Sequence, residues 1–159
     1  MKDKWMFATT IDFANLLLAS LVVGTMFGIW LGYNPTDLGA TVYVPQQQHA
    51  IRALNVTMPV LGGVTVLLTI VAAVLARNDQ TRLILLVVTV VCFVAAGLIT
   101  RFLNQPINAI VMTWSADAPP ANWMQLRDDW WRWHVLRMVV GIGGLCLLIA
   151  ATLKRASAS

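Results

Sequence analysis

The sequence predicts an all-α integral membrane protein, a four-helix bundle with one short amphipathic helix leading into the last span. Hydrophobic residues make up 58% of the 159 residues, more than a soluble domain of this size carries. Four stretches contain no Asp, Glu, Lys or Arg, and each approaches the roughly 20 residues that cross about 30 Å of hydrocarbon. They cover residues 13–36, 53–76, 83–100 and 138–153. We therefore expect a single transmembrane domain over residues 1–159, with spans at about 11–33, 50–76, 83–104 and 133–153.

Positive charges predict the orientation of this multi-pass bundle. The chain has 11 Lys and Arg residues against seven acidic residues, all of them Asp, and a net charge of +4. Because short cytoplasmic loops are enriched in Lys and Arg, we expect both termini in the cytoplasm, at a bacterial inner membrane. The residues behind this assignment are Lys2, Lys4, Arg77, Arg82, Lys154 and Arg155. Topology accounts for the basic balance, so no nucleic acid partner is expected.

The first span carries a stripe of small residues. Gly24, Gly28 and Gly32 recur every four positions, so they share one face of a helix. Small residues let another helix approach closely where lipid supplies no hydrophobic drive. The stripe therefore predicts either packing within the bundle or a homo-oligomer. The uncharged run of 24 residues exceeds a signal-peptide core, so we interpret it as a retained helix.

Polar residues gather where the second span begins. His49, Arg52 and Asn55 recur every three positions and so share a helix face. Pro59 follows one turn deeper, and we expect it to bend this helix and free a carbonyl toward the interior. The second helix is thus expected to present a polar face near the membrane boundary.

A similar polar face ends the third span. Arg101, Asn104 and Asn108 would lie on one side of a continuing helix. Pro106 disfavours helical geometry at Gln105, so we expect the end of this helix to unwind. The two asparagines could then cap the unwound end instead of contacting a ligand.

The fourth span is expected to start with an amphipathic stretch from about Asn122. One face of that stretch holds, at helical spacing, Arg127, Trp130, Trp131, His134 and Arg137. An ionisable group at this depth costs several kcal/mol, so such groups usually mark a site. The tryptophans also fit an interfacial aromatic belt, and Arg137 could reach the interface as a simple anchor.

Three of the four predicted helices bring these polar faces to the same membrane side. Such a coincidence is not expected if each polar group were only a membrane anchor. The sequence therefore predicts a polar, cationic pocket at that interface, and nothing comparable at the other membrane side.

The polar residues also resemble the signature of a known family, the anthrone oxygenase-like membrane proteins. The matching positions are Arg101-Phe-Leu-Asn104-Gln-Pro106-Ile-Asn108, then Trp114, Pro120, Trp123, Arg127, His134 and Arg137, with Gln47, His49 and Asn55 upstream. That family of small four-span proteins is catalogued mostly as a domain of unknown function. Its best-known members oxidise polyketide anthrones to anthraquinones with molecular oxygen, without a bound metal or flavin. The resemblance thus implies a cofactor-independent oxygenase acting on a small aromatic or polyketide-type substrate.

This chemistry assigns roles to the candidate residues. An anthrone is a weak carbon acid whose anion can give an electron to oxygen, so the protein needs a base and cations for the developing oxyanion. Histidine suits the first role and arginine the second. We expect His134 as the base, with His49 as the alternative, and Arg101 and Arg137 as stabilisers. Substrate binding is expected from Asn104, Asn108, Arg52, Asn55, Trp130, Trp131 and Arg127.

Other interpretations stay open. His134 could simply hydrogen-bond a loop carbonyl. His49 and His134 could instead ligate haem or copper between facing helices, although the nearby arginines would repel a cation. An arginine-rich rim would equally suit a lipid headgroup or a quinone in a non-catalytic binding protein. The expected partners are a small hydrophobic aromatic molecule or lipid and the bilayer itself, with no metal or cofactor assigned.

Overall fold

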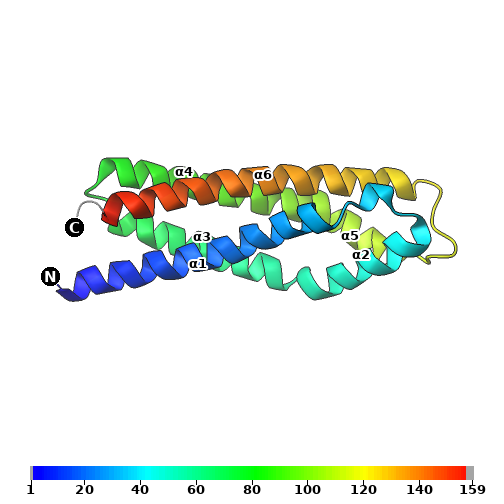
Figure 1. The fold of residues 1–159 in the computed structure, drawn as a ribbon, viewed down its shortest axis with the longest axis horizontal. Coiled ribbons are helices and arrows are strands. Elements are labelled where there is room, and N and C mark those ends of the chain that lie inside the picture. The colour runs from blue at the N-terminus through cyan, green and yellow to red at the C-terminus, as the bar shows by residue number, and fades with distance from the viewer. Residues whose placement is uncertain (1, 157–159) are drawn as a thin grey trace.

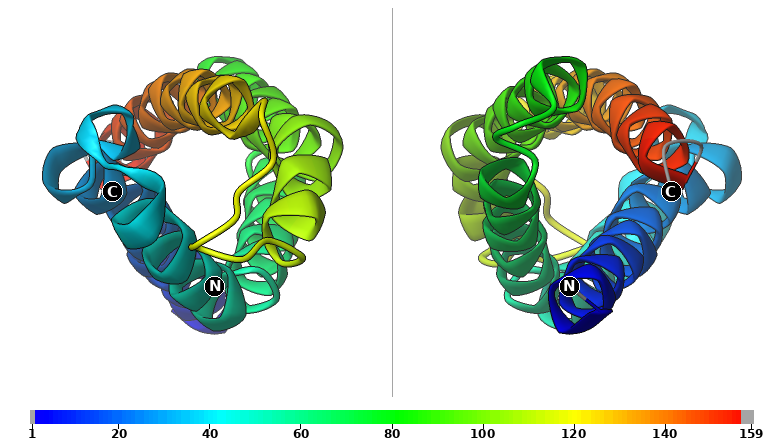
Figure 2. Two further views of the ribbon diagram at one scale, coloured as in Figure 1. Left: turned by 90° about the vertical axis from the view of Figure 1, so that its right-hand side faces the viewer. Right: turned by 90° about the vertical axis from the view of Figure 1, so that its left-hand side faces the viewer.

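The computed structural model, which describes residues 2–156, confirms the predicted all-α four-helix membrane bundle. Within that part of the chain, four helical stretches are long and apolar enough to cross a membrane. The main helices are α1 (Lys2–Gly32), α3 (Thr57–Leu75), α4 (Gln80–Ile99) and α6 (Trp123–Ala156). They form a ring in which α1 and α4 each contact both α3 and α6 (Figure 2).

The two ends of the bundle are built differently. Neighbouring helices run antiparallel, so α1 begins and α6 ends at the same end as the turn between α3 and α4 (Figure 1). We call this the terminal end. The opposite end, which we call the loop end, holds the 3-10 helix η1 (Pro35–Asp37), α2 (Ala40–Leu54), α5 (Gln105–Val111) and the loop that follows α5. The loop end therefore contains nearly all of the connecting chain.

The second predicted helix is broken rather than bent. One helix was expected over residues 50–76 with a bend at Pro59, but α2 ends at Leu54 and α3 starts at Thr57. Proline has no N–H, so it cannot bond the carbonyl four residues earlier, which belongs to Asn55, and its ring crowds that carbonyl. Pro59, which was expected to bend this helix, therefore explains the interruption at Asn55, and its effect is a break instead of a bend.

The expected unwinding before Pro106 is wrong. Gln105 keeps helical dihedral angles, with φ −63° and ψ −37°. The chain passes from α4 through a π-helical turn, η2 (Thr100–Asn104), directly into α5. Because a π turn shifts hydrogen bonds to the fifth residue, it tolerates a proline without ending the helix. Pro106 occupies the first turn of α5, where its missing N–H costs nothing.

Glycines in α6, not those in α1, bring helices close together. A Cβ at Gly141 would lie 2.8 Å from the Met26 side chain of α1, and one at Gly144 would lie 2.8 Å from Phe93 of α4. By contrast, a Cβ at Gly24, Gly28 or Gly32 would meet no atom within 4 Å. The glycine stripe of α1 therefore does not pack within the bundle, and its use between subunits stays a prediction.

One apolar core cluster lies toward the terminal end. Its buried residues are Ala19, Ala72, Ala73, Ala76, Leu86, Leu148 and Ala151. Alanines let helices approach closely, since they add little volume between backbones. A second cluster, toward the loop end, contains Ile51, Ile107, Val111 and Trp130. The amphipathic stretch that was expected before the fourth span is continuous with it in α6 and packs in this second cluster.

Candidate functional site

A cavity of about 580 Å³ lies among the helices α1 to α6. It occupies the half of the bundle nearer the loop end, which we call the loop half; the other half is the terminal half. Its wall is mainly apolar and includes side chains such as Val23, Met26, Ile29, Met58 and Phe93. Its polar wall residues include Tyr33, Gln46, Gln47, His49, Asn55, Thr100, Arg101, Gln105, Asn108 and Arg137. An apolar chamber of this size with a few convergent polar groups is typical of a small-molecule site.

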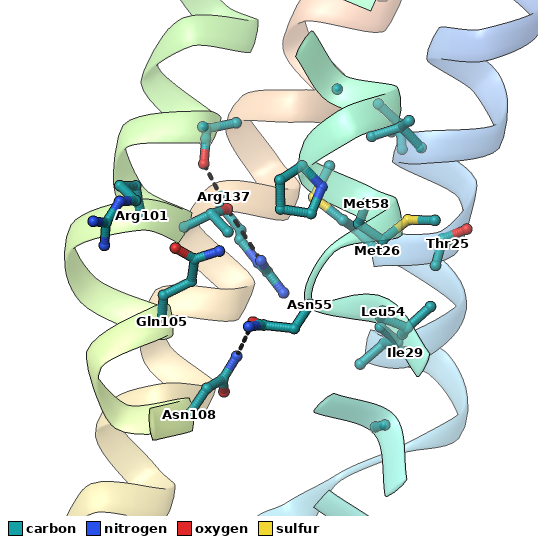
Figure 3. Close-up of a pocket in the computed structure, with 18 of the residues that line it drawn as sticks. Thr25, Met26, Ile29, Leu54, Asn55, Met58, Arg101, Gln105, Asn108 and Arg137 are labelled. Carbon is teal, nitrogen blue, oxygen red and sulfur yellow. Dashed lines mark hydrogen bonds between the residues drawn. The ribbon is translucent and has the colours of Figure 1, made fainter. Parts of the chain in front are cut away.

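Arg137 is the principal charge in this chamber. Its Nη1 donates to the Thr100 hydroxyl at 3.1 Å, and its Nη2 bonds the Nδ1 atom of His134 at 2.9 Å. Its buried Nε has no partner, and the guanidinium makes no ion pair with a carboxylate of residues 2–156. In Figure 3 the guanidinium lies between the side chains of Gln105 and Asn55. A cation held only by neutral groups is poised to bind an anionic oxygen.

His134 holds Arg137 from behind the cavity wall. The ring is fully buried, and its Nε2 lies 3.1 Å from the backbone carbonyl of Met26. Since a guanidinium can only donate, Nδ1 must accept from it, and Nε2 must carry the proton that the Met26 carbonyl accepts. Trp130 and Trp131 lie nearly parallel to the ring, at interplanar angles of 9° and 11°. Both nitrogens are therefore occupied, and the imidazole is fixed as one neutral tautomer.

A row of amides forms the loop-end side of the cavity. Asn108 of α5 donates from Nδ2 to Oδ1 of Asn55, which follows α2, at 3.0 Å (Figure 3). Oδ1 of Asn108 is buried without a partner in residues 2–156. The hydroxyl of Tyr33 donates to Oε1 of the buried Gln47 at 3.0 Å. These amides offer a ligand donors and acceptors whose positions are already set.

A family model described as anthrone oxygenase matches residues 48–147. The chain belongs to the anthrone oxygenase family. No curated protein and no solved structure matches it. The matched residues include several polar side chains of the cavity, namely His49, Asn55, Thr100, Arg101, Gln105, Asn108 and Arg137. The resemblance drawn from the sequence is thus confirmed, and the match covers α3, α4, α5 and most of α6 but not α1, which also lines the cavity.

Six of the predicted site residues line the cavity of this anthrone oxygenase family member. They are His49, Asn55, Arg101, Asn108, Trp130 and Arg137. Their positions are unequal, because His49 and Arg101 are exposed at the rim. Figure 3 shows the Arg101 side chain on the outer side of its helix, directed away from Arg137. The two arginines expected to act together therefore occupy different parts of the site.

The other five predicted residues are not among the cavity lining. Arg52 is exposed on α2, and Trp131 packs beside His134. Asn104 is buried and donates to the backbone carbonyl of Trp130 at 3.0 Å, so it joins α6 to η2. Arg127 is buried between the Leu38 carbonyl, which accepts from Nη1 at 2.9 Å, and the carboxylate of Asp128. These contacts fix the helices and the loop end around the cavity.

Several cavity residues were not predicted from the sequence. Gln105 lies one turn after Arg101 on the same helix, so the helical period was the signal that could have identified it. Thr100 is a polar residue in an apolar span and was assigned no role. Gln47 was noted only as a position that matches the family, and Tyr33 was not noted. The two residues come from separate loop-end elements, and helical spacing alone does not bring them together.

A second polar cluster lies at the terminal end, where nothing comparable was expected. Asp12 of α1 is 5% exposed, and both of its oxygens accept from Nη2 of Arg82 of α4, at 2.7 and 2.6 Å. Arg155 of α6 also donates to this carboxylate, at 2.6 Å. We call these three residues the terminal clasp. Asp12 was overlooked because it lies just before the first uncharged run, and the two arginines were read only as topology signals.

Proposed function

We propose that this protein is a membrane-embedded oxygenase that oxidises a small aromatic, anthrone-like substrate with molecular oxygen and without a bound cofactor. One observation carries the proposal: Arg137 presents an unpaired guanidinium inside an apolar chamber of about 580 Å³. The family supports oxygenase-like chemistry, and the chamber supports a ligand with an apolar body and one oxygen that becomes negative.

The proposed reaction consumes one O2 and releases one water. A base removes a proton from the methylene carbon between the rings, and the anion places its charge on the ketone oxygen. The anion gives one electron to O2, and the resulting radical and superoxide combine to form a carbon–oxygen bond. The peroxide takes up the proton and loses water, which leaves a second ketone. Arg137 stabilises the oxyanion because its donors are fixed before the charge forms.

The base in this proposal is His49, the alternative considered from the sequence. It lines the cavity at its rim, where a proton can leave toward solvent. His134 acts as a positioning residue for Arg137, since both of its ring nitrogens already have partners. The same contacts argue against His134 as a haem or copper ligand. Within residues 2–156, no group of three His, Cys, Asp or Glu side chains is placed to hold a metal.

The proposed orientation places the terminal end in the cytoplasm of an inner membrane of bacterial type. Arg77, Arg82, Lys154 and Arg155 all lie at that end, in keeping with the charge bias of cytoplasmic loops. The cavity would then lie nearer the opposite surface. Labelling of a cysteine introduced at Asp117 by an impermeant maleimide from outside spheroplasts supports this orientation, and labelling only after lysis contradicts it.

The test of the reaction is anthrone oxidation by purified protein in nanodiscs. Oxygen uptake and quinone absorbance are followed for the wild type, Arg137→Met and the control Arg132→Met, against empty nanodiscs. Arg132 lies on the same helix, but its side chain is 76% exposed. We expect Arg137→Met to lower the enzymatic rate roughly 100-fold, as for loss of an oxyanion donor, and Arg132→Met to leave it unchanged. A wild-type rate no higher than empty nanodiscs, with ligand binding retained, would favour a non-catalytic binding protein.

A further inference from the structure

The cavity reaches the surface along the seam between α3 and α4. Five of its seven exposed wall residues border this seam, namely Pro59 and Gly63 on α3 and Val94, Gly97 and Arg101 on α4 and η2. These residues come from both of the helices that border the seam. The wall of the chamber is therefore interrupted here by surface-exposed groups.

Glycines keep this seam open. A Cβ built on Gly62, Gly63 or Gly97 would meet no atom within 4 Å. The three positions thus border open space on both sides of the seam. At Gly141 and Gly144, where helices touch, a Cβ would collide with a neighbour instead. The glycines of α3 and α4 leave room, whereas Gly141 and Gly144 of α6 allow contact.

Packing on either side frames the opening. Toward the terminal end, α3 and α4 meet through the core residues Ala72, Ala73 and Leu86. Toward the loop end, the hydrogen bond between Asn55 and Asn108 links the start of α3 to α5. Gln48 adds bonds from α2 to the carbonyls of Val111 and Trp114, each at 3.0 Å. The seam is therefore a bounded opening and not a general separation of the helices.

The position of this opening along the membrane-spanning helices determines which molecules can pass through it. Its edges belong to Thr57–Leu75 and Gln80–Val111, two of the stretches long and apolar enough to cross a membrane. The opening therefore faces hydrocarbon. The other exposed wall residues, Gln46 and His49, lie on α2 outside those stretches. Water-soluble molecules such as protons can use that polar rim, while an apolar molecule is concentrated at the seam.

We propose that the seam is a lateral portal through which a membrane-dissolved substrate enters from the bilayer. The residues Pro59, Gly62, Gly63, Val94, Gly97 and Arg101 form its edges. The substrate class is a flat apolar molecule with one ketone or phenolate oxygen. Arg101, exposed at the rim and without an ion pair in residues 2–156, meets this oxygen first, and Arg137 receives it inside. The substrate class rests on the proposed function, whereas the portal depends only on the residues that line the cavity at the seam.

The kinetic test obstructs the portal with Gly97→Leu. A leucine at this position has space in the seam, so the fold should persist. Binding of a hydroxyanthraquinone to protein in nanodiscs is followed by quenching of tryptophan fluorescence in a stopped-flow instrument. We expect association and dissociation both to slow by roughly tenfold, with little change in Kd, because the obstacle lies on the path. Gly28→Leu, which also has open space but lies away from the cavity, should leave both rates unchanged.

A second measurement tests the portal without any ligand. A nitroxide is attached at Met58→Cys, inside the cavity, in a background with Cys92→Ala and Cys146→Ala. Lipid-soluble oxygen should relax the nitroxide more strongly than a water-soluble nickel chelate, and Gly97→Leu should reduce the effect of oxygen. Stronger relaxation by nickel, or no effect of Gly97→Leu, would overturn the portal. Failure of the probe to bind the wild type would count only against the proposed function.

Discussion

The arginines of the terminal clasp and Arg137 of the loop half are used in opposite ways. In the terminal clasp, Arg82 and Arg155 both bond the carboxylate of Asp12, so opposite charges are paired where three helices meet. In the loop half, Arg137 has only the neutral partners Thr100 and His134. A charge that is paired joins helices, and a charge that is held but unpaired is available to a ligand. The contrast separates the part of the bundle that maintains the fold from the part that binds.

Unpartnered polar atoms show the same asymmetry. Within residues 2–156, the buried side-chain atoms without a hydrogen-bond partner belong mostly to the loop half, including atoms of Tyr43, Asn104, Asn108, Trp130 and Arg137. The terminal half contributes Nδ2 of Asn15 and Nε of Arg82. Burying a polar atom without a partner costs stability. Three of these loop-half residues, Asn108, Trp130 and Arg137, line the cavity, where a ligand can supply the missing bonds.

The largest expected effect comes from breaking the terminal clasp. Asp12→Ala leaves two guanidiniums without their shared carboxylate, so we expect a loss of about 3–5 kcal/mol in the free energy of unfolding. Unfolding in mixed detergent micelles measures this loss. Asp3→Ala, at an exposed position of the same helix, should have little effect. If Arg137→Met proved as destabilising as Asp12→Ala, the proposed division between the halves would be wrong.

The next effect separates the two histidines. His49→Ala should lower the oxidation rate roughly 100-fold and remove the acidic limb of the pH–rate profile, because the base is lost. His134→Ala should lower the rate only about tenfold and keep the acidic limb, since it loosens Arg137 without removing the base. His134→Gln, whose amide oxygen can still accept from Arg137, should recover part of the rate. Loss of the acidic limb in His134→Ala would show that His134 is the base after all.

The smallest effect concerns Tyr43, whose buried hydroxyl has no partner in residues 2–156. Burial raises the pKa of Tyr43. The folded state therefore favours the protonated phenol. The contribution of this group to the free energy of unfolding is fully present below the ordinary tyrosine pKa and is lost as the pH rises above it. Tyr43→Phe should raise the free energy of unfolding by up to about 1 kcal/mol near neutral pH and reduce the alkaline loss of stability. Thermal unfolding between neutral and alkaline pH provides the comparison.

The matched variant for this prediction is Thr69→Val in the terminal half. The Thr69 hydroxyl contacts Oδ1 of Asn15 at 3.1 Å and the carbonyl of Thr65 at 2.8 Å. Its removal should therefore destabilise the protein slightly, opposite in sign to Tyr43→Phe. The same sign for both variants would show that unpaired groups do not distinguish the two halves.

Composition and helical spacing were sufficient to predict the bundle, because membrane spans depend mainly on runs of apolar residues. The same spacing predicted that His49, Asn55, Asn108 and Arg137 would line one cavity, since each faces inward from a helix of known period. It could not show which way His134 would point within a crowded helix face. That orientation depends on the Met26 carbonyl, which lies on another helix.

The features that sequence analysis missed depend on contacts between distant residues. Asp12 and Arg82 are 70 positions apart, and Asp12 and Arg155 are 143 apart, so no local pattern pairs them. The two prolines gave a second difficulty. Pro59 broke its helix, whereas Pro106 was absorbed by a π turn, and a proline in the sequence does not by itself distinguish these outcomes.

The most direct test of the central claim is the absorption spectrum of a bound hydroxyanthraquinone, because its phenol and phenolate have different colours. Arg137 should stabilise the phenolate in the cavity, so the bound probe should show the phenolate spectrum at a pH where the free probe is still protonated. Arg137→Met should restore the phenol spectrum, and Arg132→Met should not. A bound probe whose spectrum is the same with and without the Arg137 guanidinium would contradict the claim that this residue is the anion site.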